Sequence, residues 1–118
     1  MKYSDLDFAL QGLNTLGSGK MKGKLLLGLH KAMGAVTTGL QPAVDSQKTL
    51  WEQHGCDKLQ EGDKIPPAYI KDFAALMAEE VEGWEPDGVL KFSDYSDVEF
   101  TREALMAMEN AGIMDVDA

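Results

Sequence analysis

The feature that most limits the fold of this chain is a long run of apolar positions spaced alternately three and four residues apart. The run falls within residues 21–54 and comprises Leu26, Leu29, Met33, Val36, Leu40, Ala43, Gln47 and Leu50. Such alternation is typical of a helix face that packs against another helix, and polar Gln47 is its one exception. The spacing therefore predicts one long helix over residues 21–54.

Small residues and a proline qualify this prediction. A stripe of small side chains on the same helix would let a neighbouring helix approach closely, and it consists of Gly28, Ala32, Ala35, Gly39 and Ala43. That contact lies either within the chain or across a homodimer. Pro42 has no backbone N–H, so we expect a kink or break over residues 38–41. Gly55 is expected to cap the end of the helix.

Three shorter helices are predicted around the long one. The first covers residues 5–16, with Ser4 as its N-cap. The next begins at the double proline 66–67 and runs to Gly83. Its apolar face is expected to hold Ile70, Phe73, Met77 and Val81. Thr101 is the expected N-cap of the last helix, and Gly112 fits the left-handed position that follows a helix.

The remaining segments lack helical spacing. A Glu-Gly-Asp turn within residues 56–66 indicates a short hairpin or an ordered loop. A turn at residues 86–88 precedes either irregular structure or one short strand around residues 89–92, and residues 114–118 are expected to be a frayed tail. The sequence thus predicts a mainly α fold, one small domain over residues 1–118. It should contain about four helices, one of them long and kinked, and a short hairpin or irregular segment.

Size and composition exclude several classes of protein. The longest aliphatic block, at residues 25–29, is far shorter than the roughly 20 residues needed to cross a bilayer. A single cysteine, Cys56, excludes an internal disulfide and fits a reducing compartment. We therefore expect a cytoplasmic protein that does not span a membrane.

The net charge of −9 is concentrated in the second half of the chain. Residues 1–55 carry a net charge of +2, and residues 56–118 carry −11. An acidic surface repels nucleic-acid phosphates and attracts basic protein surfaces. We therefore expect a protein partner with a basic surface and no direct contact with nucleic acid, although solubility alone is the simpler explanation of this charge.

No motif in the sequence indicates catalysis, a metal or a cofactor. The GSGK run at residues 17–20 resembles a phosphate-binding loop, but Asn14 replaces a required glycine and Met21 replaces Ser or Thr. His54 and Cys56 offer two ligands where zinc needs three or four, and nothing beyond His54 would activate the Cys56 thiol. The carboxylates of residues 79–87 lack the spacing of a calcium loop. We predict that the protein is not an enzyme and binds no metal or cofactor.

One short pattern, FxxLMxEEV, carries a resemblance to a known class of proteins. It is formed by Phe73, Leu76, Glu79, Glu80 and Val81. With the order of a short helix, a long helix, a polar turn and two further helices, it resembles small accessory proteins of tailed phages that have no assigned activity. The resemblance implies a virus-encoded protein in the host cytoplasm and transfers no catalytic residue. Pro42 departs from this pattern because it interrupts the long helix.

Charge, composition and resemblance together favour a non-catalytic protein–protein interaction module, acting as an assembly factor or as an inhibitor of a host protein. Its acidic face would comprise the third helix and residues 84–99. The predicted partner-binding residues are Glu79, Glu80, Glu82, Trp84, Glu85, Asp87, Asp94, Tyr95 and Asp97. Trp84 and Tyr95 are expected to be exposed aromatic anchors. The alternative is an acidic mimic of nucleic acid that blocks a nuclease or defence enzyme, and a small enzyme is a third hypothesis.

Overall fold

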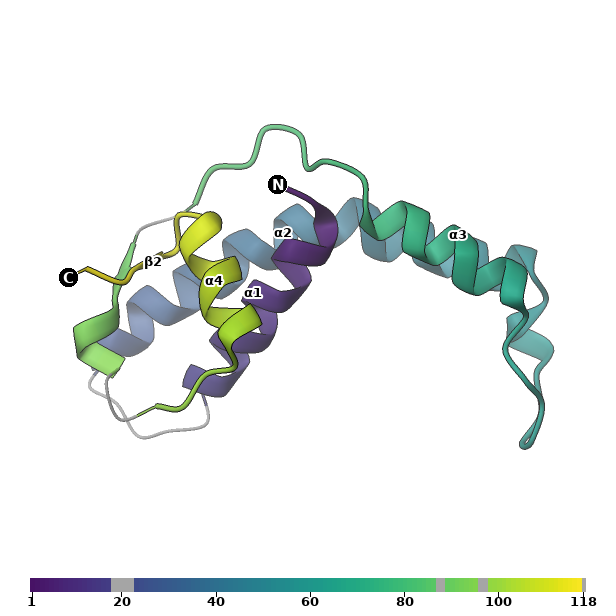
Figure 1. Cartoon of the computed structure of the whole chain (residues 1–118), viewed down its shortest axis with the longest axis horizontal. Coiled ribbons are helices and arrows are strands. Elements are labelled where there is room, and N and C mark those ends of the chain that lie inside the picture. Colours follow the sequence, from purple (N-terminus) through teal and green to yellow (C-terminus); the bar gives the residue numbers. More distant parts are fainter. Residues whose placement is uncertain (18–22, 87–88, 96–97, 118) are drawn as a thin grey trace.

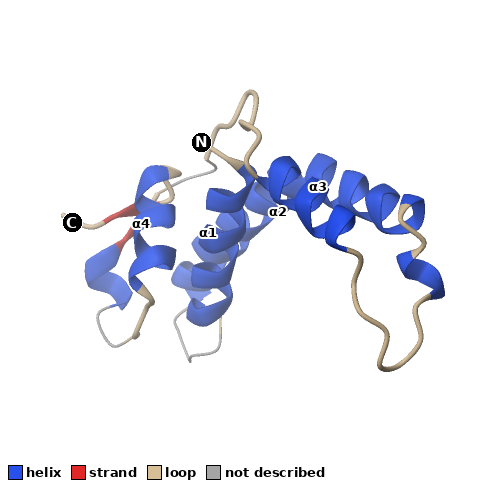
Figure 2. Cartoon of the chain, turned by 45° about the vertical axis from the view of Figure 1, so that its right-hand side comes forward, coloured by secondary structure: helices blue, strands red, loops and turns tan. Residues whose placement is uncertain are grey.

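The computed structural model describes residues 1–17, 23–86, 89–95 and 98–117, which form a mainly helical structure (Figure 1). In chain order its elements are α1 (Tyr3–Leu16), α2 (Gly23–Gln53), the 3-10 helix η1 (Cys56–Lys58), α3 (Pro67–Met77), β1 (Leu90–Lys91), the 3-10 helix η2 (Phe92–Tyr95), α4 (Arg102–Asn110) and β2 (Met114–Asp115). The molecule measures 46 × 32 × 23 Å along its principal axes. One end is a helical body and the other is a projecting arm, and α2 runs through both (Figures 1 and 2).

The body consists of α1, α4 and the first half of α2. Its core is rich in side chains from α1, whose buried face is Leu6, Ala9, Gly12, Leu13 and Leu16. This is the one-sided stripe expected of an amphipathic helix. Gly12 sets the distance between α1 and α4, because a Cβ at this position would lie only 2.7 Å from the Cε of Met108. Met108 is itself fully buried, so the close approach of the two helices depends on glycine here.

The small-residue stripe of α2 makes contacts within the chain. A Cβ at Gly39 would lie 3.1 Å from the Trp84 ring and 3.2 Å from Leu6 of α1. At Gly28, a Cβ would lie 3.4 Å from Leu90 of β1. The stripe thus accommodates one helix, one strand and one tryptophan that all pack onto α2.

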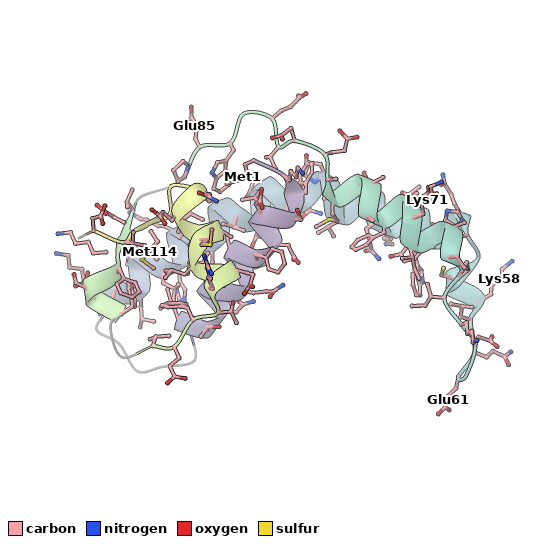
Figure 3. The ribbon with its side chains drawn as sticks, in the orientation of Figure 1. Met1, Lys58, Glu61, Lys71, Glu85 and Met114 are labelled. Atoms are coloured by element: carbon pink, nitrogen blue, oxygen red, sulfur yellow. The ribbon has the colours of Figure 1, made fainter. Side chains whose placement is uncertain are left out.

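The arm is a helical hairpin formed by the second half of α2 and α3. Gly55, at φ 71°, reverses the chain after α2, and Pro67 occupies the first helical position of α3. Few side chains are buried in the arm. Tyr69 is one of them, and its ring lies 5.1 Å from that of Trp51 and 5.9 Å from that of Phe73. Figure 3 shows Lys58, Glu61 and Lys71 on the arm, at the end of the molecule away from Met114. The arm therefore contributes little to the main core.

The last helix begins and ends as its sequence predicts. The Thr101 hydroxyl accepts a hydrogen bond from the Ala104 N–H at 3.2 Å, which confirms the predicted N-cap. Gly112 has φ 73°, and the Ile113 N–H donates to the Met108 carbonyl at 3.0 Å, which is the arrangement typical of a glycine-capped helix. The chain then enters β2, which pairs in parallel with β1.

Two predicted helix boundaries are wrong. α1 begins at Tyr3 instead of Asp5, and Lys2 replaces Ser4 as N-cap, with the Lys2 N–H donating to the Asp5 carboxylate at 3.0 Å. α3 ends at Met77 instead of Gly83. Beyond it, backbone groups of residues 79–81 bond to residues 1–3 in place of continuing the helix. Of the kink or break expected near Pro42, the break does not occur, since α2 is continuous through Pro42.

Two further predictions need correction. Ile70 was expected on the packed face of α3 but is 55% exposed, while Tyr69 takes the buried position against α2. Residues 56–66, by contrast, form η1 and a turn at Gly62, which is the ordered loop and not the hairpin of the two predicted alternatives. The predicted frayed tail is wrong at its start, because Met114 is buried and paired with Leu90. The turn predicted at residues 86–88 falls largely outside the described residues, and so do residues 21–22 and 118.

Candidate functional site

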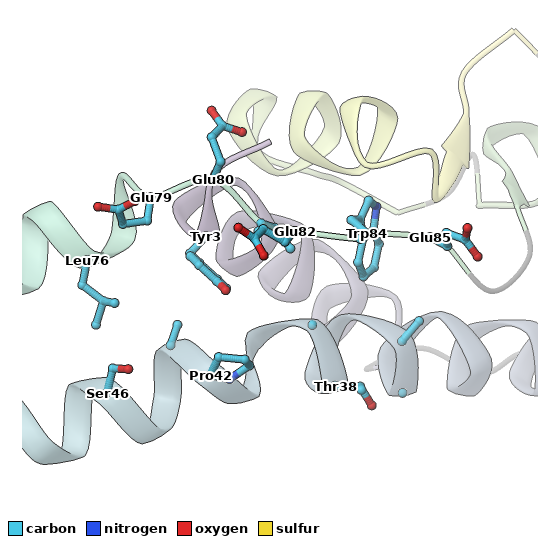
Figure 4. Close-up of a pocket in the computed structure, with 16 residues that line it drawn as sticks. Tyr3, Thr38, Pro42, Ser46, Leu76, Glu79, Glu80, Glu82, Trp84 and Glu85 are labelled. Carbon is cyan, nitrogen blue, oxygen red and sulfur yellow. The ribbon is translucent and has the colours of Figure 1, made fainter.

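An open groove of about 870 Å³ lies where the arm leaves the body. One wall is the outer surface of α2. The other is the non-helical segment 78–86, which follows α3, includes a turn at residues 82–83, and which we call the strap. Figure 4 shows the strap running alongside α2 with side chains from both elements bordering the space between them.

The floor of the groove is a row of small side chains on α2. Gly34, Thr38, Pro42 and Ser46 recur every four residues and all line the groove. Residues four apart lie on one face of a helix, so this row forms a shallow track along α2. Pro42 also leaves the Thr38 carbonyl without its usual i+4 donor, because proline has no N–H.

The strap is held in place by backbone pairing with the N-terminal residues. The Tyr3 N–H donates to the Glu79 carbonyl at 3.1 Å, and the Val81 N–H donates to the Met1 carbonyl at 2.8 Å. These two bonds flank an antiparallel bridge between Lys2 and Glu80. The amino group of Met1 also forms an ion pair with the Glu80 carboxylate at 2.6 Å.

Trp84 fixes the other end of the strap. Its indole Nε1–H donates to the Ala111 carbonyl at 2.8 Å, while its ring packs over Gly39 of α2. The tryptophan is half-buried, and it therefore joins the strap to both α2 and the segment after α4. The strap is anchored by backbone bonds at one end and by a packed aromatic ring at the other.

Carboxylates dominate the charge of the groove. The four glutamates that line it are Glu79, Glu80, Glu82 and Glu85, and all are exposed. No lysine, arginine or histidine occurs among the lining residues that the structure describes. In Figure 4, Tyr3 points from α1 toward α2, whereas Glu80 points away from α2. The groove therefore combines a small, uncharged floor with an acidic rim.

The structure brings together five of the nine predicted site residues and separates two others. Glu79, Glu80, Glu82, Trp84 and Glu85 all line the groove, although the glutamates lie on the strap instead of on a helix. The predicted acidic face on the third helix is wrong for this reason. 

Asp94 and Tyr95 lie on η2, beside a different hollow that Lys24 and Lys91 also line. Tyr95 is only 4% exposed, so its predicted role as an exposed anchor is wrong. Asp87 and Asp97 lie outside the described residues.

Tyr95 is a buried residue with an unsatisfied hydroxyl. Its hydroxyl oxygen has no hydrogen-bond partner among the residues that the structure describes. Burial raises the pKa of the Tyr95 phenol above its ordinary value, and the neighbouring Asp94 carboxylate raises the pKa further. Both effects favour the neutral phenol.

Sequence reasoning missed the floor of the groove and Tyr3. The row at Gly34, Thr38, Pro42 and Ser46 was visible as a period of four on the polar side of the apolar run. Tyr3 carried no such signal, because its position depends on pairing between residues 1–3 and the strap, which are far apart in the sequence.

The other candidate residues lie outside the groove. Cys56 is buried, and the Nε2 of His54 lies 2.8 Å from a carboxylate oxygen of Asp72. Within the described ranges, no group of three or more His, Cys, Asp or Glu side chains is arranged to hold a metal ion. The GSGK run falls mostly outside the described residues. No helix in the described part is long and apolar enough to cross a membrane.

Comparisons with known proteins give no family for this chain. No protein-family model, no curated protein and no solved structure matches it. Proposals about its function therefore rest on the geometry and charge of the groove.

Proposed function

We propose that this protein is a non-catalytic interaction module that binds a basic segment of another protein in the groove between α2 and the strap. The proposal rests on one observation: four exposed glutamates, a half-buried tryptophan and a floor of small side chains all line the same groove. A basic segment would gain charge attraction from the rim and close packing against the floor.

The arrangement of the groove suits binding better than solubility alone. Carboxylates that only keep a protein soluble need no fixed backbone, whereas the strap is held by two backbone hydrogen bonds and by the Trp84 indole. A fixed backbone lowers the entropy that is lost when a partner binds. Either of the expected roles, assembly factor or inhibitor of another protein, would use this surface.

The experiment compares two variants with equal changes in charge. The groove variant carries Glu79→Gln, Glu82→Gln and Glu85→Gln. The control variant carries Glu52→Gln, Glu61→Gln and Glu109→Gln, three exposed positions that do not line the groove. Each immobilised protein is incubated with lysate, and the retained proteins are identified by mass spectrometry at low and high salt.

We expect the wild-type protein and the control variant to retain the same partner, and the groove variant to lose it. Retention should weaken as salt increases, because the contact is between opposite charges. Equal loss with both variants would show that overall charge, and not the groove, mediates binding. Displacement of the partner by added double-stranded DNA would instead favour the nucleic-acid mimic.

A further inference from the structure

One edge of the strap is paired with residues 1–3, and its other edge is open at Glu80. In an antiparallel pair, the backbone groups of successive residues point alternately toward the partner strand and away from it. The Glu79 carbonyl accepts from the Tyr3 N–H, and the Val81 N–H donates to the Met1 carbonyl. The N–H and C=O of Glu80 therefore point to the opposite side, and neither forms a backbone hydrogen bond with any described residue.

The residues at the open edge border the groove, since Glu79, Glu80 and Val81 all line it. In Figure 4 the Tyr3 side chain points toward α2 and that of Glu80 points away from it, while Val81 is half-buried and Lys2 is exposed. The short pair formed by the strap and residues 1–3 thus lies over α2 as a layer. A further strand placed along the open edge would continue this layer and cover the small-residue floor.

The dimensions of the groove fit a short extended peptide. Its floor runs from Gly34 to Ser46, a distance of roughly 18 Å at the rise of an α-helix. A strand of five or six residues has about the same length. Side chains on alternate residues of such a strand would point to the floor, where only small groups stand in their way.

The negative charge of the strap favours a basic peptide over a second copy of this chain as the occupant of the groove. A second copy of this chain would bring its own glutamates against those of the first, and the net charge of −9 opposes that pairing. Charged residues on an open strand edge commonly prevent such self-association. A strand carrying lysine or arginine side chains would meet opposite charge along the same edge.

We propose that the partner segment is an extended, lysine- or arginine-bearing peptide that pairs as a strand with the backbone of Glu80 at the open edge of the strap, next to the exposed carboxylate of Glu82. This inference rests on the proposed function and specifies its chemistry. Backbone hydrogen bonds to the strap provide affinity, and contacts of the basic side chains with the glutamates provide selectivity.

The test uses a fluorescent six-residue probe, Lys-Thr-Lys-Thr-Lys-Thr, with blocked ends, titrated into the full-length protein. Two modified probes keep the same charge: one has N-methyl groups on the three lysine nitrogens, the other on the three threonine nitrogens. In a strand, one of these sets of N–H groups faces the strap and the other faces solvent. Binding is measured by fluorescence anisotropy, and protection of the Glu80 amide by hydrogen exchange.

We expect the unmodified probe to bind, one methylated probe to bind about tenfold more weakly, and the other to bind nearly as well as the unmodified probe. Hydrogen exchange at the Glu80 amide should slow on binding. Equal affinity of all three probes would overturn strand addition and leave only charge attraction, without contradicting the proposed function. If no probe binds while a protein partner is still lost in the groove variant, the inference also fails and the proposed function stands.

Discussion

Tyr95 and Tyr69 are two buried tyrosines whose hydroxyl groups have opposite surroundings. The Tyr69 hydroxyl accepts a hydrogen bond from the Gln47 amide at 3.0 Å, whereas that of Tyr95 has no partner among the described residues. A buried polar group loses its hydrogen bonds to water, and if it finds no partner in the protein the free energy of unfolding falls by about 1 kcal/mol or more. Tyr95→Phe should therefore raise the free energy of unfolding by about 1 kcal/mol. Tyr69→Phe is the matched control and should lower it by about the same amount, as measured by urea denaturation. A loss in both variants would contradict the assignment of an unsatisfied hydroxyl at Tyr95.

The raised pKa of Tyr95 predicts a pH dependence. An unfolded tyrosine has a pKa of about 10, and the folded-state pKa of Tyr95 lies above it. As pH rises, the unfolded chain therefore releases this proton first, which favours unfolding. The stability that depends on the neutral phenol is complete below about pH 10 and is lost as pH rises through the folded-state pKa. The stability advantage of Tyr95→Phe over wild type should grow between about pH 9 and 11 in urea titrations. A constant difference over this range would show that the two pKa values are equal.

Two glycines on α2, Gly39 within the small-residue stripe and Gly34 outside it, test the role of the stripe. A Cβ at Gly34 would meet nothing within 4 Å, so Gly34→Ala should stabilise the helix by about 0.5–1 kcal/mol. A Cβ at Gly39 would lie 3.1 Å from Trp84 and 3.2 Å from Leu6, which is fully buried and cannot easily shift. Gly39→Ala should therefore lower the free energy of unfolding by about 1–3 kcal/mol. Thermal and urea denaturation measure both, and stabilisation by both substitutions would mean that Trp84 and Leu6 are loosely packed.

Among the secondary-structure elements, α4 has the best-defined ends, and its N-cap can be tested by a conservative pair of substitutions. Thr101→Ala removes the hydroxyl that accepts from the Ala104 N–H and should lower the free energy of unfolding by about 1 kcal/mol. Thr101→Ser keeps a hydroxyl in the same place and should lose at most a few tenths of a kcal/mol. Equal losses of stability in the two variants would show that the methyl group of Thr101, and not its hydroxyl, contributes the stability.

The same elements show which parts of the fold a sequence can predict. The start of α4 and the turn at Gly112 were predictable because each depends on residues within one helical turn. The end of α3 was not, because bonds from residues 1–3 take over the backbone groups of residues 79–81. The sequence pattern of residues 77–82 is that of a helix, but backbone pairing with residues 1–3, at the other end of the chain, prevents the helix from continuing.

The same distinction between local and long-range determinants applies to the candidate site. Four glutamates and Trp84 were predictable as a group because they are close in sequence, and the strap keeps them together. Tyr95 was mispredicted because an aromatic residue in an irregular acidic segment has no pattern that distinguishes burial from exposure. Tyr95 belongs to the same buried core as Leu90 of β1 and Met114 of β2, two strands that pair although α4 separates them in the sequence.

At the scale of the whole molecule, the main core and the arm differ in how much apolar surface they bury. The main core includes no residue of α3, and its members on α2 end at Leu40. The arm is covered mainly by contacts among Trp51, Tyr69 and Phe73. Regions with few buried contacts open at lower free energy than the core of the same protein. We therefore expect α3 to detach from α2 before the body unfolds.

The two tryptophans of the chain allow a direct test, because Trp51 lies in the arm and Trp84 packs against the body. In the variant Trp84→Phe, fluorescence reports only on the arm, and in Trp51→Phe it reports only on the body. The urea midpoint seen by Trp51 should fall below that seen by Trp84 once each curve is compared with circular dichroism of the same variant. Coincident transitions would instead show that α2, which is continuous through both regions, makes the molecule a single cooperative unit. In that case a partner bound in the groove would raise the unfolding midpoint of the arm and of the body equally. If the transitions are separate, a partner bound at the strap would stabilise the body while the arm opens independently.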